Sequence, residues 1–191
     1  MTNPEASLER DLDLAVRVAR GDETAFDELV RKYQHSVFNT IHRYVGDRSA
    51  ADDIAQEVFV IVWNKAGTFK GKSSFSTWLY RIVVNQCLQF RRRRQRRPAA
   101  VSIDAIDSDN PPDALQVAED REQAERTAAV RQALVELPDR RRIALVLSHY
   151  DGHTYSEIAE MMGTSVPSVE SLIFRAKDEL RRKLIGFRSA Q

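Results

Sequence analysis

The sequence predicts an all-α protein, built as two small helical domains joined by a flexible linker. Apolar residues recur at steps of three and four in both halves of the chain, which is the period of an amphipathic helix. No stretch shows the strict alternation typical of a strand. Between the halves, Pro98, Pro111 and Pro112 lie among Ser and Asp residues, a composition that favours extended or turn conformations and independent movement of the domains. The expected boundaries are 1–97 for the first domain, 98–120 for the linker and 121–191 for the second domain.

Three helices are expected in the first domain. The first runs from about Thr24 to Gly46-Asp47, and its apolar face comprises Phe26, Leu29, Val30, Tyr33, Val37, Ile41 and Tyr44. The second has Ile54, Val58, Ile61, Val62 and Lys65 on one side. The composition of 67–74 indicates a loop, after which a third helix is expected from about Ser76 to Arg94, with Leu79, Ile82, Val83 and Leu88 as its core face.

The second domain is expected to begin with a helix from near Glu119 to Leu137, which Pro138 interrupts. A short helix follows, with Ile143, Val146, Leu147 and Tyr150 as its apolar positions and Asp151-Gly152 at its end.

The segment Thr154–Lys177 carries the clearest local signal. Thr154 and Glu157 fit a capping box, in which a hydroxyl and a glutamate three residues later satisfy free amides at a helix start. Gly163 suits the left-handed turn that ends this helix, and Ser165 suits the cap of the next one. This spacing predicts a helix-turn-helix, whose second helix enters the major groove of DNA, although an ordinary helical hairpin is the alternative. The side chains expected to face DNA are Ser165, Ser168, Glu170, Ser171, Arg175 and Lys177.

Two features of the first domain exceed what a plain helical bundle requires. The string Asp52–Glu57 either matches the dipole at a helix start or presents Gln56 and Glu57 to a partner. Residues 69–81 interleave aromatic, basic and small polar side chains, which suits single-stranded nucleic acid because rings stack on unpaired bases. The alternative is that Phe75 and Trp78 are core residues beside a solvated loop. The arginine run 91–97 either attracts phosphates or forms a solvated helix end.

Composition excludes several classes of protein. The net charge of +1 hides a basic run at 91–97 and an acidic segment at 102–125. The single cysteine, Cys87, forms no internal disulfide and is expected in the core. Because there is no apolar signal core and the longest apolar run, Val58–Trp63, is too short for a bilayer, we expect a cytoplasmic protein without membrane insertion. His149 and His153 lack further ligands nearby, so no metal site is expected. The sequence shows no phosphate-cradling glycine loop and no nucleophile-base set, so neither a cofactor nor a catalytic residue is expected.

Together these segments resemble the sigma-70 family of bacterial initiation factors, and more narrowly its extracytoplasmic-function group, which keeps only regions two and four. The likeness spans about Leu12 to Leu184 and rests on four stretches taken in order: Gly21-Asp22 through Phe26, Leu29 and Tyr33; Asp53–Phe59; Phe75–Ile82 with Val84-Asn85; and Tyr155–Ala159 through Phe174–Lys177.

The resemblance implies a role for each stretch. Core RNA polymerase would be bound by Asp52, Asp53, Ile54, Gln56, Glu57 and Phe59. The −10 promoter element would be opened, and one of its bases captured, by Phe69, Lys70, Ser73, Ser74, Phe75, Trp78, Tyr80, Arg81 and Asn85. The helix-turn-helix would read the −35 element. An anti-sigma factor is an expected partner, and the chain is expected to be monomeric outside these complexes.

The recognition helix departs from the common family pattern, because Glu170 and Leu172 stand where many relatives have arginines. Glu170 would repel phosphate but accept a hydrogen bond from a cytosine amino group. Two competing hypotheses remain. A free-standing helix-turn-helix regulator has no need of a docking string or an aromatic loop, and an enzyme acting on nucleic acid would need a carboxylate or metal constellation that the sequence lacks.

Overall fold

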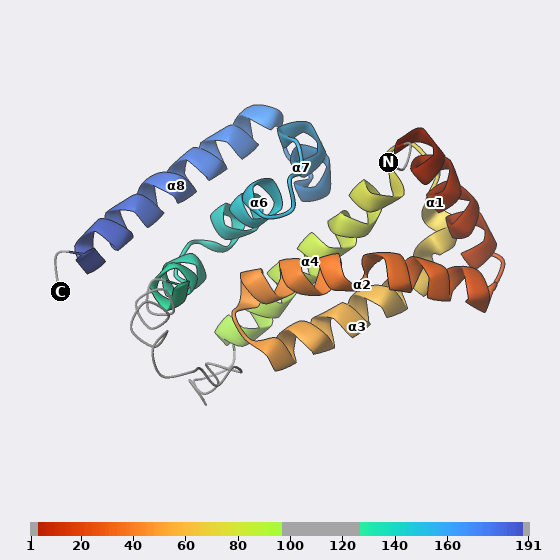
Figure 1. Cartoon of the computed structure of the whole chain (residues 1–191), viewed down its shortest axis with the longest axis horizontal. Helices are drawn as coiled ribbons and strands as arrows, with labels where there is room; N and C mark the ends of the chain where they lie inside the picture. The colour runs from red at the N-terminus through yellow and green to blue at the C-terminus, as the bar shows by residue number, and fades with distance from the viewer. Residues whose placement is uncertain (1–3, 97–126, 189–191) are drawn as a thin grey trace, which may run out of the picture.

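The computed structural model describes residues 4–96 and 127–188, and all regular structure in these two ranges is helical (Figure 1). The helices are α1 (Pro4–Val18), α2 (Glu23–Val45), α3 (Arg48–Lys65), the short 3₁₀ helix η1 (Ala66–Thr68), α4 (Phe75–Arg96), a stretch over 127–135, α6 (Asp139–His149), α7 (Tyr155–Met162) and α8 (Val166–Arg188). The all-α prediction is therefore confirmed. The linker predicted at 98–120 lies outside the described residues.

Helix α1 is a finding that the sequence analysis did not predict. Its inner face carries Leu14 and Val18, which are buried against the other helices of the first half. Asp11 lies on the same face and is only 3% exposed. It accepts hydrogen bonds from the Tyr33 hydroxyl and the Lys32 ammonium, both at 2.5 Å, so this buried carboxylate is paired from α2. The pairing fixes α1 across α2.

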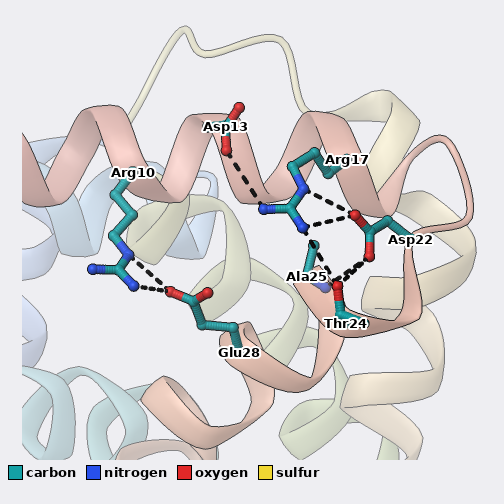
Figure 2. A network of polar contacts seen from close by, with 7 residues as sticks. All are labelled: Arg10, Asp13, Arg17, Asp22, Thr24, Ala25 and Glu28. Carbon is teal, nitrogen blue, oxygen red and sulfur yellow. Dashed lines mark hydrogen bonds and ion pairs between the residues drawn. The ribbon is translucent and has the colours of Figure 1, made fainter.

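The turn between α1 and α2 is fixed by polar contacts (Figure 2). The Asp22 carboxylate caps α2 by accepting from the Ala25 amide at 3.0 Å, and it also accepts from Thr24 and Arg17. Hydrogen bonds from Thr24, from Ala25 and from Arg17 lower the pKa of Asp22 well below its usual range. The Gly21-Asp22 pair thus ends one helix and starts the next.

The three helices predicted in the first half are confirmed, with α3 beginning earlier than its apolar pattern indicated. The Asp47 side chain caps α3 by accepting from the Ala50 amide at 2.7 Å, which starts the helix at Arg48 rather than at Asp52. Gly46 ends α2 with a φ of 79°, a conformation that glycine adopts without strain. The predicted loop 67–74 contains the end of η1 and otherwise irregular backbone.

The helix-turn-helix prediction is confirmed in the second half. Thr154 and Glu157 form both bonds of the capping box at the start of α7. Gly163 ends α7 in the left-handed conformation with a φ of 58°, and α8 begins three residues later. The apolar face of α8 buries Val169 and Ile173 against the rest of the domain. Both helices therefore form as the local sequence indicated.

The two halves share one continuous hydrophobic core rather than lying apart. Helix α7 packs on α4, and α6 packs on α2 and α4, so α6 and α7 lie between the first half and α8 (Figure 1). Arg142 of α6 is fully buried at this junction. None of the described helices is long and apolar enough to cross a membrane.

Candidate polymerase and nucleic-acid interfaces

The docking string lies along the outer face of α3. Asp52, Asp53, Gln56 and Glu57 are exposed, whereas Ile54 is only 4% exposed and belongs to the core. The i, i+1, i+4 and i+5 spacing places the four polar side chains on one side of the helix. Ile54 therefore anchors α3 in the bundle, and the side chains available to a partner are its polar neighbours.

An open groove between α2 and α3 adjoins this polar string. Its apolar lining is supplied by Phe26, Val30, Phe38, Phe59, Val60 and Trp63, and its edges include Asp52, Gln56 and Arg48. The rings of Phe26 and Trp63 meet edge to face, with centroids 5.1 Å apart. Among these apolar residues, the sequence analysis had assigned only Phe59 to polymerase docking. Val60, which is 59% exposed, is the clearest missed signal, because an apolar residue on the polar side of an amphipathic helix marks a contact surface.

An aromatic cluster connects the 69–74 loop to the start of α4. Phe69 and Trp78 are half-buried and meet with ring centroids 5.7 Å apart, while Phe75 beneath them is buried. The Ser74 hydroxyl accepts from the Thr77 amide at 3.0 Å and so caps α4. Lys70 projects into solvent from the same loop. Partly open rings beside a cation fit a surface that stacks unpaired bases and attracts phosphates.

The residues predicted to contact the −10 element do not all lie on one accessible face. Asn85 is exposed, and Ser73 is half-buried. In contrast, Phe75 is 2% and Tyr80 is 3% exposed. For Phe75 the structure favours the alternative of a core residue. Tyr80 lies against the His153 ring of the second half, with ring centroids 4.7 Å apart, so in this arrangement its ring does not reach DNA.

The outer face of α8 carries the residues predicted for the −35 element. Ser165, Glu170, Ser171, Arg175 and Lys177 are exposed, and Ser168 is half-buried. Phe174, to which sequence reasoning gave no role, is 73% exposed on this face. The signal was available, since Phe174 directly follows the buried Ile173 and so lies about 100° further round the helix. A ring that open suits apolar contact with a thymine methyl group.

The arginine run at the end of α4 divides between structure and solvent. Arg91 pairs with Asp139 of α6, with Nε and Oδ1 3.0 Å apart, and Arg93 lies 3.9 Å from Glu57 of α3. Arg92 and Arg94 are exposed and remain available to phosphates. Both interpretations of the run therefore apply, each to different members of it.

Cys87 and the two histidines that the sequence analysis considered, His149 and His153, differ in exposure. Cys87 is fully buried, which confirms its prediction as a core residue, and burial raises the pKa of its thiol well above the usual value. His149 is exposed and meets the Tyr150 ring, whereas His153 meets Tyr80. In residues 4–96 and 127–188 no three His, Cys, Asp or Glu side chains are grouped so that they could hold a metal ion.

Comparison with known proteins assigns both halves. The sequence model of Sigma-70 region 2 matches residues 29–97, and that of Sigma-70, region 4 matches residues 127–180. The RNA polymerase sigma-H factor of Pseudomonas aeruginosa is 40% identical over 182 residues, covering 92% of this chain and 94% of that protein. The ECF RNA polymerase sigma-E factor of Escherichia coli K12 is 36% identical over 187 residues, covering 91% and 94%.

The chain belongs to the extracytoplasmic-function group of the sigma-70 family.

The solved structures agree with this assignment. The structure of the protein CnrH, bound to the cytosolic domain of CnrY, resembles this sigma factor with a TM-score of 0.68 at 25% identity, covering 93% of this chain and 98% of CnrH. The region 2 match covers most of α2 together with α3 and α4, and the region 4 match covers 127–135, α6, α7 and most of α8. The protein is thus a transcription initiation factor that binds core RNA polymerase and promoter DNA.

Proposed function

We propose that this sigma factor docks on core RNA polymerase through the polar string of α3 and the adjoining apolar groove. The observation that carries the proposal is the combination of four exposed polar side chains with an open groove lined by Phe26, Phe59 and Trp63. A surface that joins an apolar centre to a polar rim is typical of a protein interface. A regulator that bound only duplex DNA would have no use for it.

The 69–74 loop and the start of α4 are proposed to capture one unpaired base of the −10 element. Phe69 and Trp78 supply partly open rings for stacking, Lys70 supplies a phosphate contact, and Arg81 and Asn85 extend this surface along α4. Flipping a base out of the duplex costs a few kcal/mol, which stacking and phosphate contacts must offset. The remaining predicted residues, Ser73, Ser74, Phe75 and Tyr80, would line or support the pocket.

Helix α8 is proposed to read the −35 element through Ser168, Glu170 and Ser171 at base edges. Arg175 and Lys177 would hold phosphates. We add Phe174 to this set because of its exposure on the same face. The expected consequence of Glu170 is a −35 sequence with a cytosine at the position that it meets, since a carboxylate accepts from the cytosine amino group.

An anti-sigma factor is the proposed regulatory partner. CnrH, which resembles this chain over nearly its whole length, is described in complex with the cytosolic domain of CnrY. We further propose that the protein acts in the cytoplasm, has no catalytic activity of its own and is monomeric outside its complexes.

A transcription experiment tests the proposed function. The purified protein is mixed with sigma-free core polymerase and a promoter library, and the transcripts are sequenced. Transcripts that share two upstream motifs are expected, and they supply the −35 and −10 sequences. Binding of palindromic duplex by a dimer, without any protein-dependent initiation, would instead indicate a free-standing regulator.

The docking surface is tested by Glu57→Arg. This change reverses a charge on the exposed face of α3 and is expected to weaken core affinity at least about fivefold, which is the ~1 kcal/mol of an exposed charge contact. Binding of the −35 duplex should not fall. The control is Glu23→Arg, an equal charge change at an exposed position in the first turn of α2. Unaltered core affinity in Glu57→Arg would place docking elsewhere.

A further inference from the structure

The part of α4 that is proposed to capture the −10 strand is contacted by the second half of the chain. The Tyr80 ring is buried and meets the ring of His153, which lies in the turn before α7. Arg81 donates two hydrogen bonds, of 3.1 and 2.9 Å, to the backbone carbonyl of Glu160 in the last turn of α7. Two of the side chains proposed to contact promoter DNA are thereby engaged by the first helix of the helix-turn-helix.

A buried arginine joins the two halves at the other end of this contact. The Arg142 guanidinium of α6 donates to the Tyr44 carbonyl of α2 at 2.7 Å and to the Leu137 carbonyl at 3.0 Å. Burial lowers the pKa of Arg142 to about 10, so the side chain remains charged at neutral pH. Both terminal nitrogens of this buried guanidinium are paired, whereas its Nε has no hydrogen-bond partner among the described residues, and one of the two acceptors belongs to the other domain.

A second polar contact lies between the turn after α6 and the middle of α2. Asp151 accepts a hydrogen bond from the buried Thr40 hydroxyl at 2.7 Å and lies 3.7 Å from the Arg43 guanidinium. The Arg43 guanidinium also lies over the Tyr150 ring, 4.9 Å from its centroid. The contacts of Asp151 with Thr40 and Arg43, like that of Tyr150 with Arg43, join the second half of the chain to α2. We call the contacts of Thr40, Arg43, Tyr44, Arg142 and Asp151 the clasp.

The packing around the clasp is tight. A Cβ atom added to Gly46 would lie only 2.8 Å from a methyl group of Val135 in the second half. The Arg91–Asp139 pair adds a further link between α4 and α6. The two halves therefore pack closely from the end of α2 to the start of α7.

The other functional surfaces remain open in this arrangement. Helix α8 lies on the side of the molecule away from α1–α3, with α6 and α7 between (Figure 1). Phe174 and Arg175 on its outer face are exposed, as are Gln56 and Glu57 on α3. The domain contact thus engages Tyr80 and Arg81 of one DNA-facing surface and leaves core docking unobstructed.

We propose that the clasp holds the free sigma factor in a closed resting state, in which region 4 occupies Tyr80 and Arg81 of the strand-capturing face of region 2 and leaves the recognition helix accessible. The proposal rests on the proposed function, because it takes Tyr80 and Arg81 to belong to the −10 surface. Since apparent affinity falls with the fraction of competent molecules, release of the clasp raises affinity for a −10 strand without a new contact.

The test compares Asp151→Lys with Asp13→Lys in the full-length chain. Asp151→Lys removes the acceptor of Thr40 and faces Arg43 with a like charge, whereas Asp13→Lys makes the same charge change on a side chain that is 68% exposed on α1. The probes are a single-stranded oligonucleotide with the −10 sequence selected by the transcription experiment and a duplex with the selected −35 sequence. Anisotropy measures both affinities. Domain separation is followed by energy transfer between dyes at Arg20→Cys and Arg181→Cys, since Cys87 is buried and escapes labelling.

Release of the clasp is expected to raise single-strand affinity at least fivefold over Asp13→Lys, to shift energy transfer and to leave −35 duplex affinity within about twofold. The charge swap Arg43→Asp with Asp151→Lys should restore most of the wild-type behaviour. Equal energy transfer in Asp151→Lys and wild type, with equal strand affinity, would overturn the closed state. A shift in energy transfer without a gain in strand affinity would show that the contacts of Tyr80 and Arg81 do not limit strand binding. Failure of the proposed function is distinct, because then neither open nor closed chain directs initiation with core polymerase.

Discussion

The strand-capturing face of α4 and the recognition face of α8 differ in how accessible their side chains are in the free chain. On α4, Tyr80 is buried and Arg81 is held by a backbone carbonyl of α7. On α8, Arg175 and Lys177 extend into solvent. Both surfaces are proposed to touch the same promoter, yet the domain contact engages only one of them.

The difference follows from what each surface must recognise. Stacking on unpaired bases requires aromatic rings, and apolar surface left in water costs roughly 25 cal/mol per Å². Reading base edges in a duplex requires polar groups such as those of Ser171 and Arg175, which water solvates well. An aromatic ring such as Tyr80 therefore gains from being covered until DNA replaces the cover, whereas a duplex-reading surface does not.

The largest effect is expected from Arg142→Met, which keeps volume but removes the donors to the Tyr44 and Leu137 carbonyls. Each buried acceptor left unpaired costs about 1–3 kcal/mol, so for two acceptors we expect the free energy of unfolding to fall by about 2–6 kcal/mol. Urea unfolding followed by circular dichroism measures it. Arg140→Met, at an exposed position of the same helix, should stay within about 0.5 kcal/mol of wild type. Equal stability of the two variants would show that Arg142 does not hold the domains together.

Trp78→Ala should weaken only the functions proposed for the α4 surface, which are −10 strand binding and duplex opening. Loss of one stacking ring costs about 1–3 kcal/mol, which is roughly a five- to 150-fold loss of −10 strand affinity and of duplex opening. Core binding and −35 duplex affinity should persist. Because Trp78 also packs on Phe69 and Phe75, thermal unfolding must accompany the measurement, and Trp78→Phe should retain most of the binding. Normal opening of a fully duplex promoter by Trp78→Ala would remove this residue from the −10 surface.

Thr154→Ala should destabilise the helix-turn-helix, to which α8 belongs, by removing a local cap. The substitution removes the hydroxyl that accepts from the Glu157 amide, and loss of such a cap costs about 1 kcal/mol of stability. Ser156→Ala, in the exposed first turn of the same helix, is the matched control. Denaturant unfolding measures the loss of stability in both variants. A control as unstable as Thr154→Ala would show that loss of the cap does not cause the destabilisation.

The smallest expected effect is a dependence of the closed state on pH. Burial lowers the pKa of His153, which faces Tyr80 of α4 and lies near Asp151 and Glu157. The closed state therefore prefers neutral imidazole, and its stability is present above the ordinary histidine pKa of about 6.5 and declines as pH falls below it. His42, whose pKa burial also lowers, acts in the same direction.

Asp151 opposes the two histidines at lower pH. Burial raises the pKa of its carboxyl, so the closed state gains protons more readily than the open state as pH falls toward that pKa. Between pH 7.5 and 6, the histidines should dominate and opening should increase by less than about tenfold. Energy transfer across this range measures opening, and His153→Gln with His42→Gln should flatten the response. A response of the double variant equal to that of wild type would exclude the histidines as its source.

The sequence by itself determined the helical class and the helix-turn-helix. Thr154, Glu157 and Gly163 act within a few residues of themselves, through a capping box and a left-handed turn, so their outcome needs no distant partner. The polar face of α3 was equally predictable, because helical periodicity fixes which side chains share a side. Phe174 could have been included by the same rule.

Tertiary structure alone decided which of those surfaces are accessible. Helix α1 packs through Asp11 on Tyr33, and the buried Tyr80 packs on His153, a residue 73 positions later in the chain. Arg142 is the last of three consecutive arginines, 140–142, yet it is fully buried at the domain contact. Periodicity states which residues share a face of a helix, but not what covers that face. Burial of a charged or aromatic side chain depends on the partner that a distant segment supplies.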